Sequence, residues 1–446
     1  MKYLHASLVG LSSLLVLAPM GCSTAMKDDA AADGGLDGGG DGDEGGGDDG
    51  GGDEGGGDDG GGDDGGGDDG GGDDGGGDDG GGGDDGGGDD GGGDDGGAGE
   101  PGDGGGDDGG SGGDEGGEAG QLTAGEWRDL DNWGFWRGLF EGDAWASMEG
   151  HWGYFSARHF AVAVVAEDHG VADAQVTLLD GQDEPIWRAR TDNLGRAELF
   201  AGLFGEEVSG PFDLVVDAGG HTTTVADVAP TADDPIVVEA SASDPPARLD
   251  LMFVIDTTGS MGDELSYLQT ELEDVIERVA AAAGETLEIR LSVNFYRDRE
   301  DAYVVRSFPF TTNVGEALTQ LAAQNADGGG DYEEAVEEAL ADAVLEHEWS
   351  GQARARLLFL VLDAPPHHTQ DRIEILHDAT EAAADMGIRI VPLAASGIDK
   401  DTEFLLRFLD VSTGGTYVFL TDHSGIGNPH MEPTIGEYQM EFLNDL

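Results

Sequence analysis

The amino-acid sequence predicts an α/β fold in which a doubly wound, mostly parallel sheet spans residues 249–446. A small all-β sandwich and a long disordered tether rich in Asp and Gly precede it. Three observations lead to this prediction. Apolar, strand-like runs alternate with helical patterns after residue 249, which indicates parallel strands with helices on both faces. Short runs rich in Val and Thr fill residues 160–242, as in an antiparallel sandwich. Repeats of GGGDD occupy most of residues 28–120.

The first residues, 1–21, are expected to be an export signal. Lys2 is the positive end, and the apolar run over residues 8–20 is too short to span a bilayer. Cys22 follows this run and is the only cysteine, which excludes an intrachain disulfide. Its position resembles the lipid-modified cysteine of bacterial lipoproteins, which implies an exported protein anchored by lipid in the cell envelope. Ser23, rather than an aspartate, follows this cysteine. This resembles the sequence of Gram-negative lipoproteins that are sorted to the outer membrane. Signal cleavage that leaves Cys22 unmodified is the alternative.

Residues 22–120 predict a spacer that has no fold of its own. The repeats contain no large apolar residue that could build a core, and their like charges repel one another. A glycine-rich coil of this length spans roughly 50–60 Å root-mean-square. The whole chain carries a formal net charge of −75. This charge argues against binding to nucleic acid and suits cations or cationic partners. Solubility in a salty habitat and calcium binding are two further explanations for it.

Residues 121–246 are expected to contain a Trp-rich segment followed by the β-sandwich. Five of the seven tryptophans lie between residues 127 and 152. They are expected to pack a small core or seal its edge, and sugar binding by exposed rings is the alternative. The phrases VADAQVTLLD and TDNLGRAEL resemble the carboxypeptidase-regulatory or transthyretin-like sandwich domains of exported bacterial proteins. No pattern in this part of the sequence points to catalysis.

The elements after residue 249 are expected in alternating order. LDLMFVI is a continuous apolar run, as expected of a strand buried on both faces. A helix over residues 263–283 carries an apolar stripe and ends at Gly284. LEIRLSVNFY is the next strand, VVRSFPF is a candidate third strand, and DYEEAVEEALADAVLEH is another helix. The remaining strands ARLLFLVLD, IRIVPLAA and TYVFLT are separated by helices over residues 373–386 and 402–409.

Two aspartates end strands that a doubly wound order makes neighbours. Asp256 follows the first strand and Asp363 follows the fourth, so both are expected in one crevice at the carboxyl edge of the sheet. Two carboxylates this close need a cation between them, or one of them must stay protonated. Thr258 and Ser260 add hydroxyls on the same tight loop. Oxygen ligands of this kind suit Mg²⁺, Mn²⁺ or Ca²⁺ rather than zinc.

Three segments, DTTGSM, GGGDYEEA and VLDAPPHH, together resemble the metal-ion-dependent adhesion site of the von Willebrand factor type A domain, which has a Rossmann-like fold. The resemblance implies that Asp256, Thr258, Ser260 and Asp363 bind a divalent cation, most commonly Mg²⁺, directly or through water. It also implies that an acidic group of a partner supplies the last ligand.

The second of these segments departs from the family pattern. Asp331 stands where many members have threonine, and Glu334 stands where integrin-β-like members place a glutamate ligand. Both residues are candidates for a third acidic ligand. In the alternative interpretation Asp331 caps the following helix. Asp298 and Asp301 are expected in a solvated acidic loop, and His367 and His368 in packing or partner contact.

The function expected from these features is that of a surface-tethered lipoprotein. It binds a protein or other acidic ligand through a divalent cation. A structural envelope anchor with a fold-stabilising metal site is one alternative, and a metal-dependent hydrolase is another. The sequence contains no GxSxG, HExxH or P-loop motif, so we expect that the protein is not an enzyme.

Overall fold

The computed structural model describes residues 119–446, except residues 168, 233, 242–245 and 284–285. The expected export signal, Cys22 and the acidic repeats therefore lie outside the described residues. All described residues belong to one compact unit. Within the described part, no helix has both the length and the hydropathy needed to cross a membrane.

The largest element of the fold is a mixed sheet of eight strands in the order β12-β11-β10-β13-β14-β15-β1-β16. Five neighbouring strands are parallel: β11 (Glu288–Tyr296), β10 (Arg248–Asp256), β13 (Ala355–Leu362), β14 (Ile388–Ala394) and β15 (Tyr417–Leu420). Their apolar runs are buried, as the sequence predicts. The antiparallel strands are β12 (Val305–Arg306) on one side and β1 (Thr123–Trp127) and β16 (Met440–Phe442) on the other.

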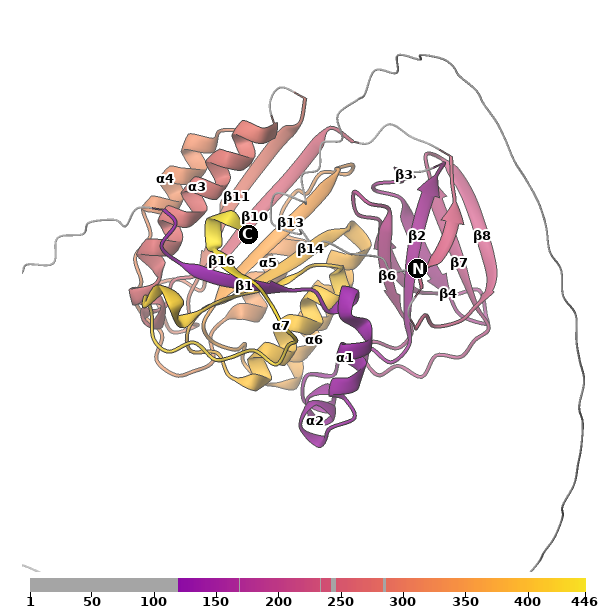
Figure 1. The fold of residues 1–446 in the computed structure, drawn as a ribbon, viewed down its shortest axis with the longest axis horizontal. Helices are drawn as coiled ribbons and strands as arrows, with labels where there is room; N and C mark the ends of the chain where they lie inside the picture. The colour runs from indigo at the N-terminus through magenta and orange to yellow at the C-terminus, as the bar shows by residue number, and fades with distance from the viewer. Residues whose placement is uncertain (1–118, 168, 233, 242–245, 284–285) are drawn as a thin grey trace, which may run out of the picture. The chain divides into compact units, whose positions relative to one another are not determined.

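Helices cover both faces of this sheet (Figure 1). The helices α3 (Leu265–Ala283) and α4 (Val314–Ala322) pack on one face through an apolar core that includes Leu268 and Leu321. A second core lies under α5 (Val336–Leu345), α6 (Gln370–Met386) and α7 (Lys400–Thr413), and it includes Leu340 and Phe408. Helix α4 was not expected from the sequence. The mixed α/β architecture predicted for this region is confirmed.

Residues 159–239 form two four-stranded sheets. One contains β2 (His159–Ala166), β3 (His169–Gly170), β6 (Arg196–Phe200) and β9 (Ile236–Glu239). The other has the order β5 (Pro185–Arg190), β4 (Gln175–Leu179), β7 (Phe212–Ala218) and β8 (His221–Val228). The short runs predicted over residues 160–242 correspond to these strands. Alternate residues are buried in β2, β4 and β7, so each of these strands turns one face to the core.

The first described strand belongs to the large sheet and not to the sandwich, which differs from the domain boundary expected at residue 121. Strand β1 pairs with β15 on one side and with β16 on the other, and Figure 1 shows it beside β16. Gly125 makes this fit possible, because a Cβ at residue 125 would lie 2.6 Å from the ring of Phe419 and 2.7 Å from that of Tyr438. Upstream of β1, the buried carboxylate of Glu271 on α3 accepts hydrogen bonds from the backbone amides of Gly120, Gln121 and Leu122.

The Trp-rich segment packs against the α/β part. It forms the helices α1 (Trp133–Leu139) and α2 (Asp143–Trp152), and the rings of Trp136 and Trp152 are buried. Trp136 meets Phe408 of α7 edge to face, with 4.9 Å between the ring centroids. Nearby, the buried guanidinium of Arg407 donates two hydrogen bonds to the buried carboxylate of Asp129, at 2.6 and 2.8 Å. These tryptophans serve the core and do not present an exposed platform.

The sandwich and the large sheet also share polar contacts. Arg356 of β13 pairs with Asp173 at 2.9 Å, and both side chains are buried. Arg389 of β14 donates to the backbone carbonyl of Arg190 on β5 at 2.7 Å. The apolar core beneath α6 and α7 continues without a break into the sandwich. The described residues of the sandwich and of the large sheet therefore share one apolar core.

Candidate metal centre

The strand order places two predicted ligands at one edge of the large sheet. Strand β10 lies between β11 and β13, so the winding direction reverses at β10 and β13. Asp256 is the last residue of β10, and Asp363 directly follows β13. Their side chains are 0% and 4% exposed. The charge of Asp256 contributes to raising the pKa of Asp363, as expected of two carboxylates at one site.

The loop after β10 orients the carboxylate of Asp256. Its Oδ1 accepts hydrogen bonds from the backbone amide of Thr258 at 2.8 Å and from the Thr258 hydroxyl at 2.7 Å. The hydroxyl oxygens of Thr258 and Ser260 lie 3.2 Å apart. The other carboxylate oxygen of Asp256, Oδ2, is buried and has no hydrogen-bond partner among the described residues. The sequence DTTGS thus fixes one oxygen and leaves the second available to a ligand.

Asp331 and Glu334 both lie between the glycine-rich loop and α5, but their side chains have different environments. Asp331 is exposed, whereas Glu334 is only 3% exposed. The backbone amide of Glu334 donates to the carbonyl of Pro365 at 2.9 Å, which holds this residue beside the loop that carries Asp363. The helix begins at Val336 with Ala335 as its N-cap. The interpretation that Asp331 caps this helix is therefore wrong, and the predicted helix start at residue 331 is five residues too early.

Burial and mutual repulsion perturb the three acidic groups of the centre. Burial is the largest cause in each case, and neighbouring carboxylates add to the effect at Glu334 and Asp363. The pKa of Asp256 is raised to about 6, that of Asp363 to about 7 and that of Glu334 to about 9. At Asp256 the charge of Arg297 offsets part of this rise.

The donor set fits a divalent cation. Three buried carboxylate oxygens, Asp256 Oδ2, Glu334 Oε2 and Asp363 Oδ1, have no hydrogen-bond partner among the described residues. Unpartnered buried acceptors are costly, and a cation or a proton relieves that cost. With the hydroxyls of Thr258 and Ser260 they form an all-oxygen set, as Mg²⁺, Mn²⁺ and Ca²⁺ prefer.

A second acidic cluster lies near this edge, and it is occupied by arginines. Carboxylate oxygens of Glu337 and Glu338 and a nitrogen of His367 lie within 4.8 Å of one another. Arg372 pairs with Glu338 at 2.7 Å, and Arg299 also contacts that carboxylate. Nδ1 of His367 lies 3.2 Å from Glu337, and its Nε2 faces Asp298 in the acidic loop after β11. Because two arginines already pair with these acids, we interpret the cluster as an ion-pair network.

The acidic loop after β11 is less solvated than expected. Asp298 is partly buried, and its Oδ1 lies 3.3 Å from Nε2 of His367. The carboxylate of Asp301 accepts from the backbone amide of Gly329 at 2.8 Å, and Gly329 adopts a φ of +73°. This loop therefore holds the glycine-rich loop in place. His368 instead stacks on His151 of α2, with ring centroids 3.6 Å apart, which is a packing contact.

Sequence reasoning missed two residues beside the centre. Glu264 is fully buried, contributes to raising the pKa of Asp363, and lies 2.9 Å from Nε2 of His430 near the end of the chain. The hydroxyl of Tyr332 donates to the carbonyl of Gly397 at 3.1 Å and joins the loops before α5 and α7. No local pattern marks either residue, because both contacts join segments far apart in the sequence.

The fold defines a class of protein: an α/β domain with buried acidic residues at the switch point of its sheet. Residues 251–365 match the family model described as "von Willebrand factor type A domain". The chain therefore contains a von Willebrand factor type A domain, and such a domain is consistent with a role in protein interaction or adhesion.

Two similar proteins cover limited parts of the chain. The "Putative ariadne-like RING finger protein R811" of Acanthamoeba polyphaga mimivirus is 29% identical over 125 residues, which are 27% of this chain and 12% of that protein. The chain thus spans about one-eighth of the length of that relative. The solved structure of "conserved hypothetical protein BatB from Bacteroides thetaiotaomicron" has a TM-score of 0.30 and 13% identity, and covers 38% of this chain and 89% of that one.

Proposed function

We propose that residues 249–446 form a divalent-cation-dependent binding domain that recruits a partner protein or another ligand through an acidic group. One observation carries this proposal: three buried carboxylate oxygens, one each from Asp256, Glu334 and Asp363, have no hydrogen-bond partner among the described residues, and the charges of Asp256 and Asp363 act on Glu334. Asp256, Thr258, Ser260, Asp363 and Glu334 would hold the cation, with Mg²⁺ first and Mn²⁺ or Ca²⁺ as alternatives.

The residues of the centre have different tasks. Thr258 positions the carboxylate of Asp256 through two hydrogen bonds. Ser260 is exposed, and its hydroxyl lies 3.2 Å from that of Thr258. When bound, the cation supplies an open coordination position for an outside oxygen. Glu334 adds a third negative charge, so the filled site has a formal charge of about −1 and attracts an acidic partner less strongly than a site with two carboxylates.

We further propose that the domain acts outside the cell, anchored by lipid on Cys22 and held away from the membrane by the acidic spacer. This proposal is based on the lone cysteine, which lies between an apolar signal-like run and the GGGDD repeats. Mass spectrometry of the mature amino terminus tests this proposal. Diacylglycerol on Cys22 is the expected result, and an unmodified Cys22 or cleavage at another residue would refute it.

Titration calorimetry on the full chain tests the metal centre. The parent protein is expected to bind one Mg²⁺ or Mn²⁺ ion, and Asp256→Ala is expected to abolish that binding. The variant should stay folded, because removal of one buried carboxylate relieves repulsion on Asp363. The matched control is Asp331→Ala, which removes an exposed acid from the neighbouring loop. Unchanged affinity in Asp256→Ala would refute the site.

A second experiment separates binding from a purely structural role of the cation. Envelope extracts are passed over the immobilised chain in Mg²⁺ and, in parallel, in EDTA. A ligand that is retained only in Mg²⁺, and lost in Asp256→Ala, supports recruitment by the ion. If the cation raises the melting temperature while retention is the same in both buffers, the domain uses its metal as a structural anchor.

A further inference from the structure

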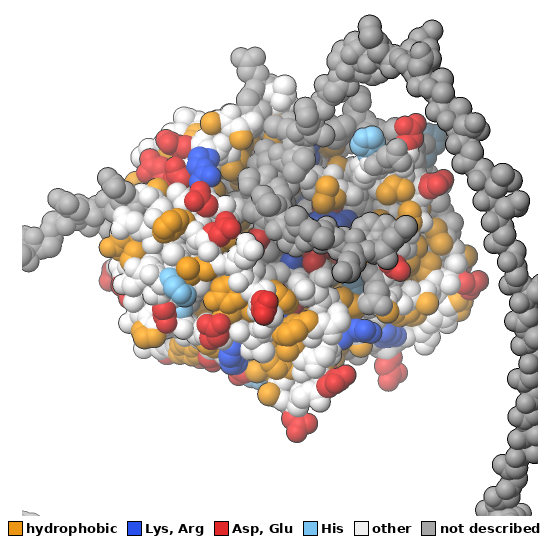
Figure 2. Space-filling view, viewed as in Figure 1, with side chains coloured by type: hydrophobic (Ala, Val, Ile, Leu, Met, Phe, Trp, Pro, Cys, Tyr) orange, Lys and Arg blue, Asp and Glu red, His pale blue; other side chains and the backbone are white. Residues whose placement is uncertain are grey.

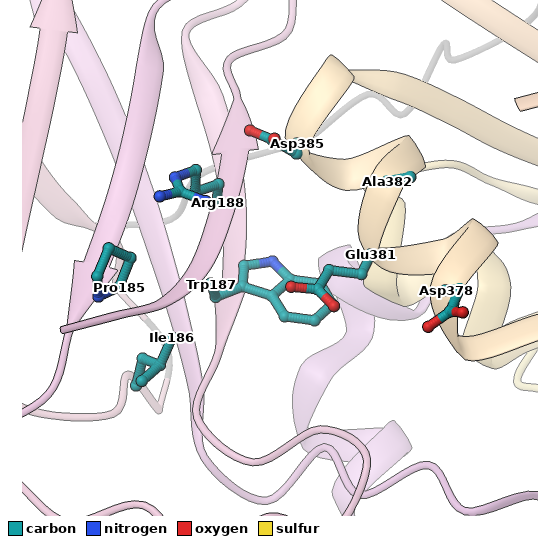
Figure 3. Close-up of a pocket in the computed structure, with 8 residues that line it drawn as sticks. All are labelled: Pro185, Ile186, Trp187, Arg188, Asp378, Glu381, Ala382 and Asp385. Carbon is teal, nitrogen blue, oxygen red and sulfur yellow. The ribbon is translucent and has the colours of Figure 1, made fainter. Parts of the chain in front are cut away.

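Acidic residues far outnumber basic ones in this chain, so few cations are available to pair with buried acids. The sequence has 95 Asp and Glu residues against 20 Lys and Arg residues, and Figure 2 shows Asp and Glu side chains spread over one face with fewer basic side chains among them. The cleft between β5 and α6, of about 320 Å³, is an example, because Asp378, Glu381 and Asp385 line it. Figure 3 shows the side chain of Arg188 directed away from α6. An acid that is fully buried therefore needs a cation built into the fold.

Glu264 is a fully buried acid, and its partner is a histidine of the C-terminal segment, residues 421–446. Its Oε1 lies 2.9 Å from Nε2 of His430, whose side chain is 4% exposed. His430 is the only Lys, Arg or His within 4.0 Å of the Glu264 carboxylate among the described residues. At the other ring nitrogen, Nδ1 of His430 lies 3.0 Å from Oδ1 of Asp422. An imidazole with a carboxylate at each nitrogen must donate from both, which only its protonated form does.

The backbone around Glu264 is shaped to admit this contact. Gly427 has a φ of +84°, and a Cβ at residue 427 would lie 2.2 Å from Oε1 of Glu264. A glycine is therefore required for the segment to approach the carboxylate so closely. On another side, the backbone amide of Ser396, just after β14, donates to the same oxygen at 3.2 Å. Glu264 thus joins the C-terminal segment to the loop that follows β14.

Downstream of His430 the segment crosses the start of α7. Nζ of Lys400 donates a hydrogen bond to the carbonyl of Glu432 at 2.6 Å, and the amide of Thr434 donates to Oε1 of Glu403 at 2.6 Å. The segment then forms β16 and pairs with β1. Histidine is the residue type that ordinarily changes its charge near neutral pH. Of these contacts, the one through His430 is therefore expected to respond to pH.

The surroundings of His430 favour its charged form. Burial by itself lowers the pKa of His430, but the carboxylates of Glu264 and Asp422 outweigh burial and raise it. Hydrogen bonds from His430, with the charge of His423, lower the pKa of Asp422. Burial and neighbouring charges, including that of Glu264, raise the pKa of Asp363. A raised histidine pKa stabilises the folded state fully below the unfolded value of about 6.5, and this contribution is lost as pH rises through the folded value.

We propose that His430 is a pH switch for the C-terminal segment: its imidazolium holds residues 421–446 against Glu264, and loss of its proton loosens them. Without that proton, Glu264 would stay buried with no cation beside it, which is costly, and opening of the segment gives its carboxylate access to water. The switch does not depend on the proposed metal-dependent function, because Glu264 is not among the residues that would hold the cation.

The imidazole resonances of the full chain, recorded in EDTA, test the charge state of His430 directly. The His430 resonance, assigned by its loss in His430→Asn, is expected to titrate with a midpoint above about 6.5. Glu264→Gln keeps the size of the side chain and removes its charge, so it should lower that midpoint. A midpoint at or below about 6.5 in the parent, or an unchanged midpoint in Glu264→Gln, would overturn the proposal.

Hydrogen exchange followed by mass spectrometry tests the release of the segment. At pH 6, amides of residues 421–446 should exchange roughly tenfold faster in His430→Asn than in the parent, because a charge-assisted contact is lost. One pH unit above the titration midpoint, the two proteins should exchange at similar rates, since the parent has then lost the proton as well. Comparison at equal pH cancels the intrinsic pH dependence of exchange.

The matched control is His423→Asn, which removes an exposed imidazole from the same segment. It should exchange like the parent at both pH values. Equal acceleration by the two substitutions, or an effect of His430→Asn that is as large above the midpoint as at pH 6, contradicts the switch. Because EDTA removes divalent cations, each outcome is independent of whether the metal centre binds one.

Discussion

At the scale of single residues, Asp331 and Glu334 show that two acids of one loop can differ in solvent exposure. They are three positions apart, yet Asp331 is exposed and Glu334 is buried at the metal centre. The sequence could not choose between them. The choice depends on the bond from the Glu334 amide to the Pro365 carbonyl and on two glycines with positive φ. Asp256 and Asp363 were predictable because each one ends an apolar strand.

This difference gives a paired prediction for metal affinity. Glu334→Gln is expected to lower Mg²⁺ affinity by roughly tenfold or more, because it removes a charged oxygen donor from the site. At saturating metal it should also strengthen binding of a carboxylate peptide, because the filled site becomes less negative. Asp331→Asn is the control and should change neither constant. Calorimetry measures both, and equal effects of the two substitutions would contradict the assignment.

The raised pKa values predict how metal binding depends on pH. The pKa values of about 6, 7 and 9 for Asp256, Asp363 and Glu334 mean that the metal-free site retains protons near neutrality. The cation must displace these protons, so its affinity should rise as pH increases from 6 to 8. Calorimetry in two buffers with different ionisation enthalpies should detect proton release. Affinity that is constant over this range would show that the carboxylates are already ionised.

At the scale of secondary-structure elements, β1 is the element that sequence reasoning missed. TAGEW is short and carries no alternating apolar pattern. Its position depends on β15 and β16, which lie about 300 residues further along the chain in register with it. The parallel strands were predictable because each is a continuous apolar run. An antiparallel strand such as β1 is held by hydrogen bonds to the strands on either side. Those strands are distant in the sequence, so the segment itself carries no local signal.

The packing around β1 predicts opposite effects of two glycine substitutions. Gly125→Ala should destabilise the protein by about 1–3 kcal/mol, since the new Cβ would meet two aromatic rings at 2.6 and 2.7 Å. Gly134→Ala, in α1, has open space around its Cβ and should stabilise by up to about 1 kcal/mol. Chemical denaturation measures both changes. A neutral Gly125→Ala would show that β1 is loosely packed.

At the scale of the whole molecule, the sandwich, the Trp-rich helices and the large sheet depend on one another. The predicted domain boundary near residue 246 marks a change of sequence pattern, but the apolar core continues across it. Strand β1 closes one side of β15, and Asp129 neutralises Arg407 inside the protein. Long-range pairs of this kind cannot be deduced from local patterns, because either residue alone reads as an ordinary surface charge.

Removal of residues 1–247 tests this dependence. The shortened chain loses β1 and leaves buried Arg407 with Glu403 as its remaining acidic partner within 4.0 Å among the described residues. We expect it to be less stable than a chain beginning at residue 119 by about 3 kcal/mol or more. The chain beginning at residue 119 should unfold in one transition by calorimetry. Two separate transitions in that chain, or equal stability of both chains, would contradict the shared core.

The antiparallel direction of β1 has a mechanical consequence. Ala124 pairs with Leu420 at the carboxyl end of β15, so the chain enters the sheet at the same edge that carries Asp256 and Asp363. Tension between a captured ligand and the upstream chain would therefore run across the strands rather than along them. Load in that direction separates backbone hydrogen bonds one after another, whereas load along a strand is shared among many. The hydrogen bonds from Gly120, Gln121 and Leu122 to Glu271 lie upstream of β1, and they would bear the pull first.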